Sequence, residues 1–142
     1  MMIAQAFVTL VLCSAITAVA GESTVTAISR TNAENYKDRA LAFCIAESYK
    51  GSKAGDDARI SMSVFLEWTY YDSENGDKAV DNLVEKYLKR DYSNPVEGYA
   101  GAQFNLLKCI DMYHSKELAE QVRKYVPHPN WIGDKPAKRK RK

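Results

Sequence analysis

The sequence is poor in the residues that most often bind metals or act as nucleophiles. Its 142 residues include two histidines, His114 and His128, and three cysteines, Cys13, Cys44 and Cys109. The histidines and the two later cysteines do not match the compact ligand spacing of a zinc site. A cysteine nucleophile needs a nearby histidine, and His114, five residues after Cys109, falls on a different helix face. We therefore expect no metal and disfavour a catalytic thiol.

Charged side chains are absent from the first twenty residues. The apolar run from Ala6 ends in Ala18-Val19-Ala20, so we expect a secretory signal peptide over residues 1–20, cleaved after Ala20. The segment lacks the usual Lys or Arg before its apolar run, which leaves an uncleaved membrane anchor as the alternative. The bulky Leu12 argues against lipid attachment to Cys13.

Cleavage would leave residues 21–142, enough for one domain. Residues 21–31 are small and polar, and predict a flexible leader before a single domain over residues 32–134. Two cysteines would remain in an oxidising compartment, so a disulfide between Cys44 and Cys109 is the favoured interpretation. Closing a loop of about 66 residues would stabilise the fold by on the order of 4 kcal/mol in the chain-entropy model.

The sequence shows no alternation of apolar and polar residues, no internal repeat and no glycine-rich phosphate loop. Apolar residues instead recur at helical spacing, and we predict an all-α fold, a compact bundle of about five helices with one disulfide. The first expected helix covers about 32–50, and the second runs from Asp56 or Asp57 to Tyr71. The third covers about 77–90. The fourth runs from Pro95 to Tyr113, and the fifth from Ser115 to just before Pro127. Gly98 and Gly101 disfavour a helix, and we expect a close helix crossing there.

The net charge of +2 hides an uneven distribution. Six of the twenty Lys and Arg residues lie in the last eight residues, KPAKRKRK, whereas residues 21–134 hold fourteen against eighteen Asp and Glu. Residues 135–142 therefore predict a basic disordered tail on an acidic domain. Basic runs can bind nucleic acid or anionic lipid. No aromatic residue is interleaved here, so we expect neither a nucleic-acid partner nor a stable membrane anchor.

Paired carboxylates could hydrolyse glycosides. Most acids, however, cluster at predicted helix starts, where capping explains them. Glu47 and Glu67 differ, because they lie within helices beside apolar residues, and burial against Trp68 would raise the pKa of Glu67. A solvated helix flank is the favoured interpretation for both, so we expect no catalytic residues.

Nine tyrosines are many for this length, and tyrosines in loops often anchor protein interfaces. Tyr92 is the best-placed candidate. Two acidic loops are expected at opposite ends of the third helix, and the residues that we predict to bind a partner come from them: Asp91, Tyr92, Ser93, Asn94, Asp72 and Glu74. The loop 91–94 is the first choice, because it combines a charge, an aromatic ring and a following proline.

Three segments carry a resemblance to a known family: NYKDRALAFCIAESYK, FNLLKCIDMYHSKEL and VRKYVPHPNWIGD. The first has a central Cys and a later Tyr, here Cys44 and Tyr49. The second has Cys109 followed by Tyr-x-Ser-x-x-Leu, and the third has Trp131 near its end. Over residues 35–134 the chain is similar to the immunity proteins of type VI secretion amidase effectors, which are small exported α-helical proteins.

The resemblance implies a periplasmic protein that binds and inhibits a peptidoglycan amidase, an enzyme with a Cys-His pair that cuts the peptide stems of the cell wall. It implies that this chain does no chemistry, needs no cofactor and blocks the amidase cleft, often as a homodimer with a protruding loop. An acidic domain would complement a cleft of positive potential. Two alternatives stay open: an inhibitor of another envelope enzyme or effector and, less favoured, a peptidoglycan hydrolase.

We predict that the exported protein contains no free thiol before reduction. A thiol-reactive dye, added under denaturing conditions, should label Cys44 and Cys109 only after a reductant has been added. Labelling of the unreduced protein would contradict the disulfide.

Overall fold

The computed structural model describes residues 24–93 and 95–136, and five α-helices account for most of them. The helices are α1 (Asn32–Ser48), α2 (Lys53–Glu67), α3 (Ser73–Leu88), α4 (Asn105–Tyr113) and α5 (Lys116–Tyr125). A 3-10 helix, η1 (Thr26–Ser29), precedes them, and a two-residue antiparallel hairpin, β1 (Trp131–Ile132) and β2 (Lys135–Pro136), follows. The predicted all-α bundle is confirmed. The predicted signal peptide, Asn94 and residues 137–142 of the predicted tail lie outside the described residues.

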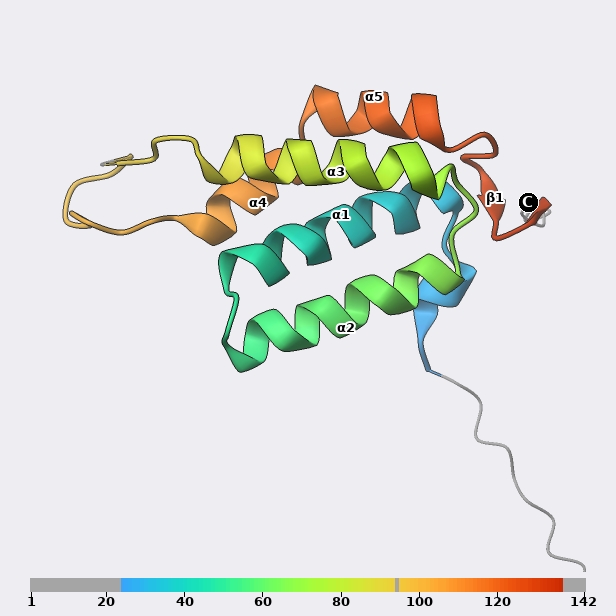
Figure 1. Cartoon of the computed structure of the whole chain (residues 1–142), viewed down its shortest axis with the longest axis horizontal. Coiled ribbons are helices and arrows are strands. Elements are labelled where there is room, and N and C mark those ends of the chain that lie inside the picture. The colour runs from blue at the N-terminus through green and yellow to red at the C-terminus, as the bar shows by residue number, and fades with distance from the viewer. Residues whose placement is uncertain (1–23, 94, 137–142) are drawn as a thin grey trace, which may run out of the picture.

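α1 runs through the centre of the bundle, with α2 along one side and α3, α4 and α5 on the other (Figure 1). The buried core draws on α1, α3, α4, α5 and the residue after α5. Its members are Tyr36, Ala40, Cys44, Val80, Leu83, Val84, Tyr87, Cys109, Met112, Leu118, Val122 and Val126. α2 contributes none of them and is a flanking helix. Among the described residues, no helix combines the length and hydrophobicity needed to span a bilayer.

Side-chain caps fix the starts of α1 and α5 where the sequence predicts them. Thr31 Oγ1 accepts a hydrogen bond from the Glu34 N–H at 3.3 Å, and the Glu34 carboxylate accepts one from the Thr31 N–H at 2.8 Å. This reciprocal capping box satisfies two amide groups that would otherwise lack partners. Ser115 Oγ accepts from the Leu118 N–H at 3.1 Å and starts α5 in the same way.

α3 begins earlier than predicted. The sequence analysis treated Asp72–Asp77 as a break, but the Asp72 carboxylate accepts a hydrogen bond from the Asn75 N–H at 3.2 Å and caps a helix that starts at Ser73. Short polar residues are common both in turns and in first helical turns, so the sequence does not separate the two.

α4 begins later than predicted, at Asn105 rather than Pro95. Gly98 and Gly101 have φ angles of 91° and 81°, and Phe104 has φ of 50°. Left-handed backbone at three positions prevents a continuous right-handed helix. The glycines therefore belong to a loop, and the close helix crossing expected at these positions does not occur.

α2 begins at Lys53, where Ser52 caps it, rather than at Asp56 or Asp57. Its buried residues are the small Gly55 and Ala58, which face α1. The apolar stripe of this helix stays at the surface, since Ile60 is 66% exposed and Val64 is 38% exposed.

Two buried asparagines of α1 connect the ends of the described chain. Asn35 Nδ2 donates to the Ala27 carbonyl at 3.0 Å, so η1 is attached although the sequence predicts a flexible leader there. Asn32 Nδ2 donates to the carbonyls of His128 at 3.1 Å and Gly133 at 2.8 Å. These bonds gather the first and last described segments at one end of the bundle (Figure 1).

We predict that Gly55→Ala destabilises the protein. A Cβ at position 55 would overlap the backbone carbonyl of Tyr49, so α2 would have to move away from the end of α1. Overpacking of this kind costs about 1–3 kcal/mol. The midpoint of thermal unfolding should fall by several degrees, whereas Asp57→Ala, at an exposed site of the same helix, should change it little. An unchanged midpoint for Gly55→Ala would contradict the close approach.

Candidate functional site

A disulfide joins the two helices that flank the candidate site. Cys44 of α1 and Cys109 of α4 are fully buried and bonded, with their Cα atoms 5.6 Å apart. Ser48 Oγ lies 3.3 Å from Cys109 Sγ. The predicted Cys44–Cys109 pairing is confirmed, and neither sulfur is a thiolate nucleophile in this state.

The histidines lie in structural contacts. His114 is the C-cap residue of α4, and its ring packs edge-on against Tyr113. His128 stacks against Trp131, with ring centroids 3.9 Å apart, and against Tyr70 at 6.0 Å. Within residues 24–93 and 95–136, no three His, Cys, Asp or Glu side chains are grouped so that they could hold a metal ion.

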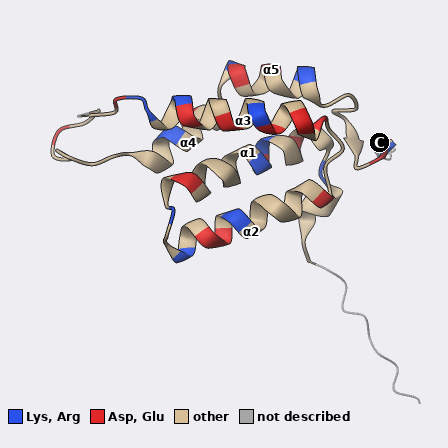
Figure 2. Cartoon of the chain, viewed as in Figure 1, with Lys and Arg blue, Asp and Glu red and all other residues tan. Residues whose placement is uncertain are grey.

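The most prominent surface feature is the α3–α4 loop, residues 89–104, which extends beyond the bundle (Figure 1). Val96 and Tyr99 are each 60% exposed. After Lys89 and Arg90, residues 91–104 include two acids, Asp91 and Glu97, and no Lys or Arg (Figure 2). The part of the loop beyond Arg90 is therefore acidic and carries exposed apolar side chains.

Asp91 and Ser93 shape the start of this loop. The Asp91 carboxylate accepts a hydrogen bond from the Ser93 N–H at 2.8 Å. The hydrogen bonds from Ser93 lower the pKa of Asp91, so this carboxylate stays charged over the physiological range. Asn94, the fourth predicted contact residue of the loop, lies outside the described residues.

Tyr92 is half-buried and braced against α4. Its hydroxyl donates to Asp111 Oδ2 at 2.5 Å, and the Lys108 ammonium lies 5.7 Å from the centre of its ring. The hydrogen bond to Asp111, followed by partial burial, raises the pKa of Tyr92. The sequence analysis proposed Tyr92 as an interface anchor, and the structure places its ring and hydroxyl in contacts within the chain.

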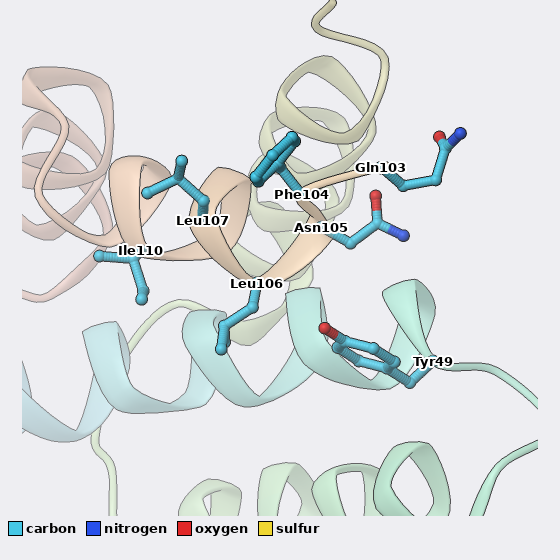
Figure 3. Close-up of a pocket in the computed structure, with 7 residues that line it drawn as sticks. All are labelled: Tyr49, Gln103, Phe104, Asn105, Leu106, Leu107 and Ile110. Carbon is cyan, nitrogen blue, oxygen red and sulfur yellow. The ribbon is translucent and has the colours of Figure 1, made fainter. Parts of the chain in front are cut away.

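An apolar groove lies beside the loop, between the start of α4 and the end of α1 (Figure 3). It has a volume of about 460 Å³ and is lined by Tyr49, Gln103, Phe104, Asn105, Leu106, Leu107 and Ile110. Leu106 and Ile110 are 48% and 40% exposed. The sequence signal for this groove is the presence of Leu106, Leu107 and Ile110 around a short helix, more apolar residues than one buried face can hold.

The other predicted contact residues lie at the far end of α3. The Asp72 carboxylate accepts hydrogen bonds from the Asn75 side chain and backbone, which lower the pKa of Asp72. Glu74 is exposed and pairs with Lys78 at 3.7 Å. The structure thus brings Asp91, Tyr92 and Ser93 together, and leaves Asp72 and Glu74 at the opposite end of the helix.

Neither Glu47 nor Glu67 is hydrogen-bonded to a second carboxyl group among the contacts of the described residues, and Glu47 lines a hollow with Asp81 and Glu85. Glu47 forms an ion pair with Arg59 at 2.9 Å. Glu67 is exposed at the end of α2, in a shallow hollow with Trp68 and Asp134. Both positions fit the solvated helix flanks that the sequence favours.

Comparison with known protein families finds a match over residues 34–122 to the model described as Tai4, type VI secretion system (T6SS) amidase immunity protein. A comparison with curated proteins finds no match.

Two solved structures are similar to this chain. One comes from work on new type VI-secreted toxins and self-resistance proteins in Serratia marcescens; it has 26% sequence identity and a TM-score of 0.68, over 80% of this chain and 90% of the matched chain. The other belongs to the effector–immunity system Tae4/Tai4 from Salmonella typhimurium, with 28% identity and a TM-score of 0.63, over 72% and 96% of the two chains.

Proposed function

The chain belongs to the family of type VI secretion system amidase immunity proteins, and from this premise we propose that it binds and inhibits a peptidoglycan amidase. It does so in the periplasm, after removal of residues 1–20, and catalyses no reaction itself. Its partner is the cognate amidase effector, which cuts cell-wall peptide stems with a Cys-His pair. The observation that carries the proposal is the protruding α3–α4 loop, held on a disulfide-linked scaffold beside an exposed apolar groove.

The loop has the properties of a plug for an enzyme cleft. A narrow protrusion can enter a cleft that a flat surface cannot, and the exposed Val96 and Tyr99 provide apolar contact area. Asp91 and Glu97 make the part beyond Arg90 acidic, which favours a cleft of positive potential and speeds the encounter. Bound there, the loop would exclude the peptide stem from the catalytic cysteine.

The groove would enlarge the interface at the base of the loop. Leu106 and Ile110 remain substantially exposed, and contiguous exposed apolar side chains commonly mark protein-binding surfaces. A side chain of the amidase that fills this groove would be desolvated in the centre of the interface, where binding energy concentrates.

The second candidate function, inhibition of a different envelope enzyme, would use the same loop and groove. Digestion of purified peptidoglycan separates the possibilities. The mature chain should stop digestion by the amidase of the same type VI gene cluster and should release no muropeptides by itself. Digestion by the chain alone would identify a hydrolase, and failure to stop the amidase would favour another target.

We predict that replacing Asp91, Tyr92 and Asn94 together by alanine abolishes inhibition. The change removes the Asp91 charge and the hydrogen bond from Tyr92 to Asp111, but it leaves the core and the disulfide intact. Inhibition and far-ultraviolet circular dichroism should be measured together, with Asp57→Ala/Glu120→Ala as a control at exposed acids outside the loop. Full inhibition by the triple variant would contradict this site. In that case Asp72→Ala/Glu74→Ala tests the other predicted loop.

We also propose a homodimer. Support comes from the apolar surface that α2 leaves uncovered, where Ile60 and Val64 line a second groove against η1. The mature chain should sediment at twice its monomer mass, and Ile60→Asp should shift it to the monomer without loss of helicity. A monomeric wild-type chain would contradict the dimer, and a dimer that persists in Ile60→Asp would contradict this interface.

A further inference from the structure

Lys108 is a buried cation in a position where the packing of α4 does not require one. It lies between Leu107 and Cys109, and only 5% of its surface is exposed. Burial of an ammonium group without partners is unfavourable, and lysines are almost never buried unless they are paired. The contacts of this side chain therefore indicate what it does.

The first contact is with the end of α3. Lys108 Nζ donates a hydrogen bond to the Leu88 carbonyl at 3.0 Å, and Leu88 is the last residue of that helix. Carbonyls in the last turn of a helix lack intrahelical partners and carry partial negative charge, so an ammonium is stabilised there. The nearby Lys89 pairs with Glu85, whereas Arg90 packs over the Tyr87 ring and also interacts with Tyr92.

The second contact is with the loop that leaves α3. The Lys108 ammonium lies 5.7 Å from the centre of the Tyr92 ring, within the range of a cation–π interaction. Asp111, one helical turn further along α4, accepts the Tyr92 hydroxyl proton in a hydrogen bond of 2.5 Å. Two successive turns of α4 thus hold one tyrosine at its ring and at its hydroxyl.

Lys108 also lies where the two arms of the loop meet. A small hollow of about 160 Å³ is lined by residues 90–93 of the outgoing arm, by residues 101–103 of the returning arm and by Lys108. The side chain therefore contacts the end of α3 and Tyr92 of the outgoing arm, and it shares this hollow with the returning arm.

From these contacts we infer that Lys108 is the positioning residue of the α3–α4 loop. It fixes the base of the loop, residues 90–93 and 101–104, so that the tip around Val96 and Tyr99 is presented in one orientation. The inference rests on the proposed function, in which this loop engages the amidase. A loop ordered before binding loses less conformational entropy on binding, and affinity rises accordingly.

The variant Lys108→Met tests whether the charge and hydrogen bond of Lys108 order the loop, or only the volume of its side chain. Methionine has a similar length and a flexible apolar stem, but it can neither donate to the Leu88 carbonyl nor attract the Tyr92 ring. Lys108→Arg keeps the charge and the donor and should rescue function. Lys116→Met, at an exposed lysine at the start of α5, is the matched control.

The first measurement needs no amidase. Hydrogen–deuterium exchange should accelerate in Lys108→Met at loop amides that are bonded in the structure, those of Ser93 and Ala102, by about tenfold or more. The amides of α1 should keep their protection. Asp111→Asn, at an exposed site, weakens the same brace without changing the core and should accelerate the same amides.

The second measurement is inhibition of the amidase from the same type VI gene cluster. Lys108→Met should weaken inhibition by about tenfold or more, and Lys108→Arg and Lys116→Met should inhibit like the wild-type chain. Unchanged loop exchange in both Lys108→Met and Asp111→Asn would overturn the inference, as would faster exchange with unchanged inhibition. If the wild-type chain does not inhibit the amidase, the proposed function fails, and loop exchange alone decides whether Lys108 orders the loop.

Discussion

The Cys44–Cys109 disulfide is the constraint on which the candidate site depends. α4 has nine residues, too few to be stable as an isolated helix, and only three of them are buried. The disulfide attaches α4 covalently to the central helix α1. The chain between the two cysteines contains α2, α3 and the protruding loop. Because Lys108 precedes Cys109 and Asp111 follows it, the residues that brace the loop are held next to the covalent bond. Loss of the bond would therefore affect the loop first.

A second, polar network fixes α3, from which the loop departs. Tyr36 of α1 donates from its hydroxyl to the Gly76 carbonyl at 3.2 Å, and Arg39 pairs with Asp77 at 2.8 Å. The Tyr71 hydroxyl also donates to Asp77, at 2.7 Å. Burial raises the pKa of both Tyr36 and Tyr71, so both hydroxyls remain donors at physiological pH. α3 is thus anchored to α1 at its start, and the loop leaves from its other end.

Much of the fold could be predicted because local signals agree with tertiary packing. The capping box at Thr31 and the cap at Ser115 define helix starts by side-chain chemistry, and the two cysteines that remain after the expected export, Cys44 and Cys109, predict their own pairing. The start of α4 was missed because Gly98 and Gly101 were assigned to a helix crossing, whereas both glycines and Phe104 have left-handed φ angles that end the helix pattern there.

The position of the candidate site could be predicted from the sequence, but the roles of its individual residues could not. The loop 91–94 was chosen from its composition, which cannot tell whether Tyr92 faces solvent or α4. Its hydroxyl partner Asp111 and its neighbour Lys108 lie 19 and 16 positions away in the chain, and no spacing rule connects them. The exposed groove beside Leu106 was hidden for a related reason, since apolar periodicity reports which face is apolar but not whether another element covers it.

The hydrogen bonds of Asn32 and Asn35 have a practical consequence. They gather both ends of the described chain at one pole of the bundle, and the α3–α4 loop projects from the other (Figure 1). A bead, a surface or a fused domain attached at either end would therefore leave the loop facing outward. The molecule has the layout of a display scaffold, in which loop sequences can be exchanged far from the point of attachment.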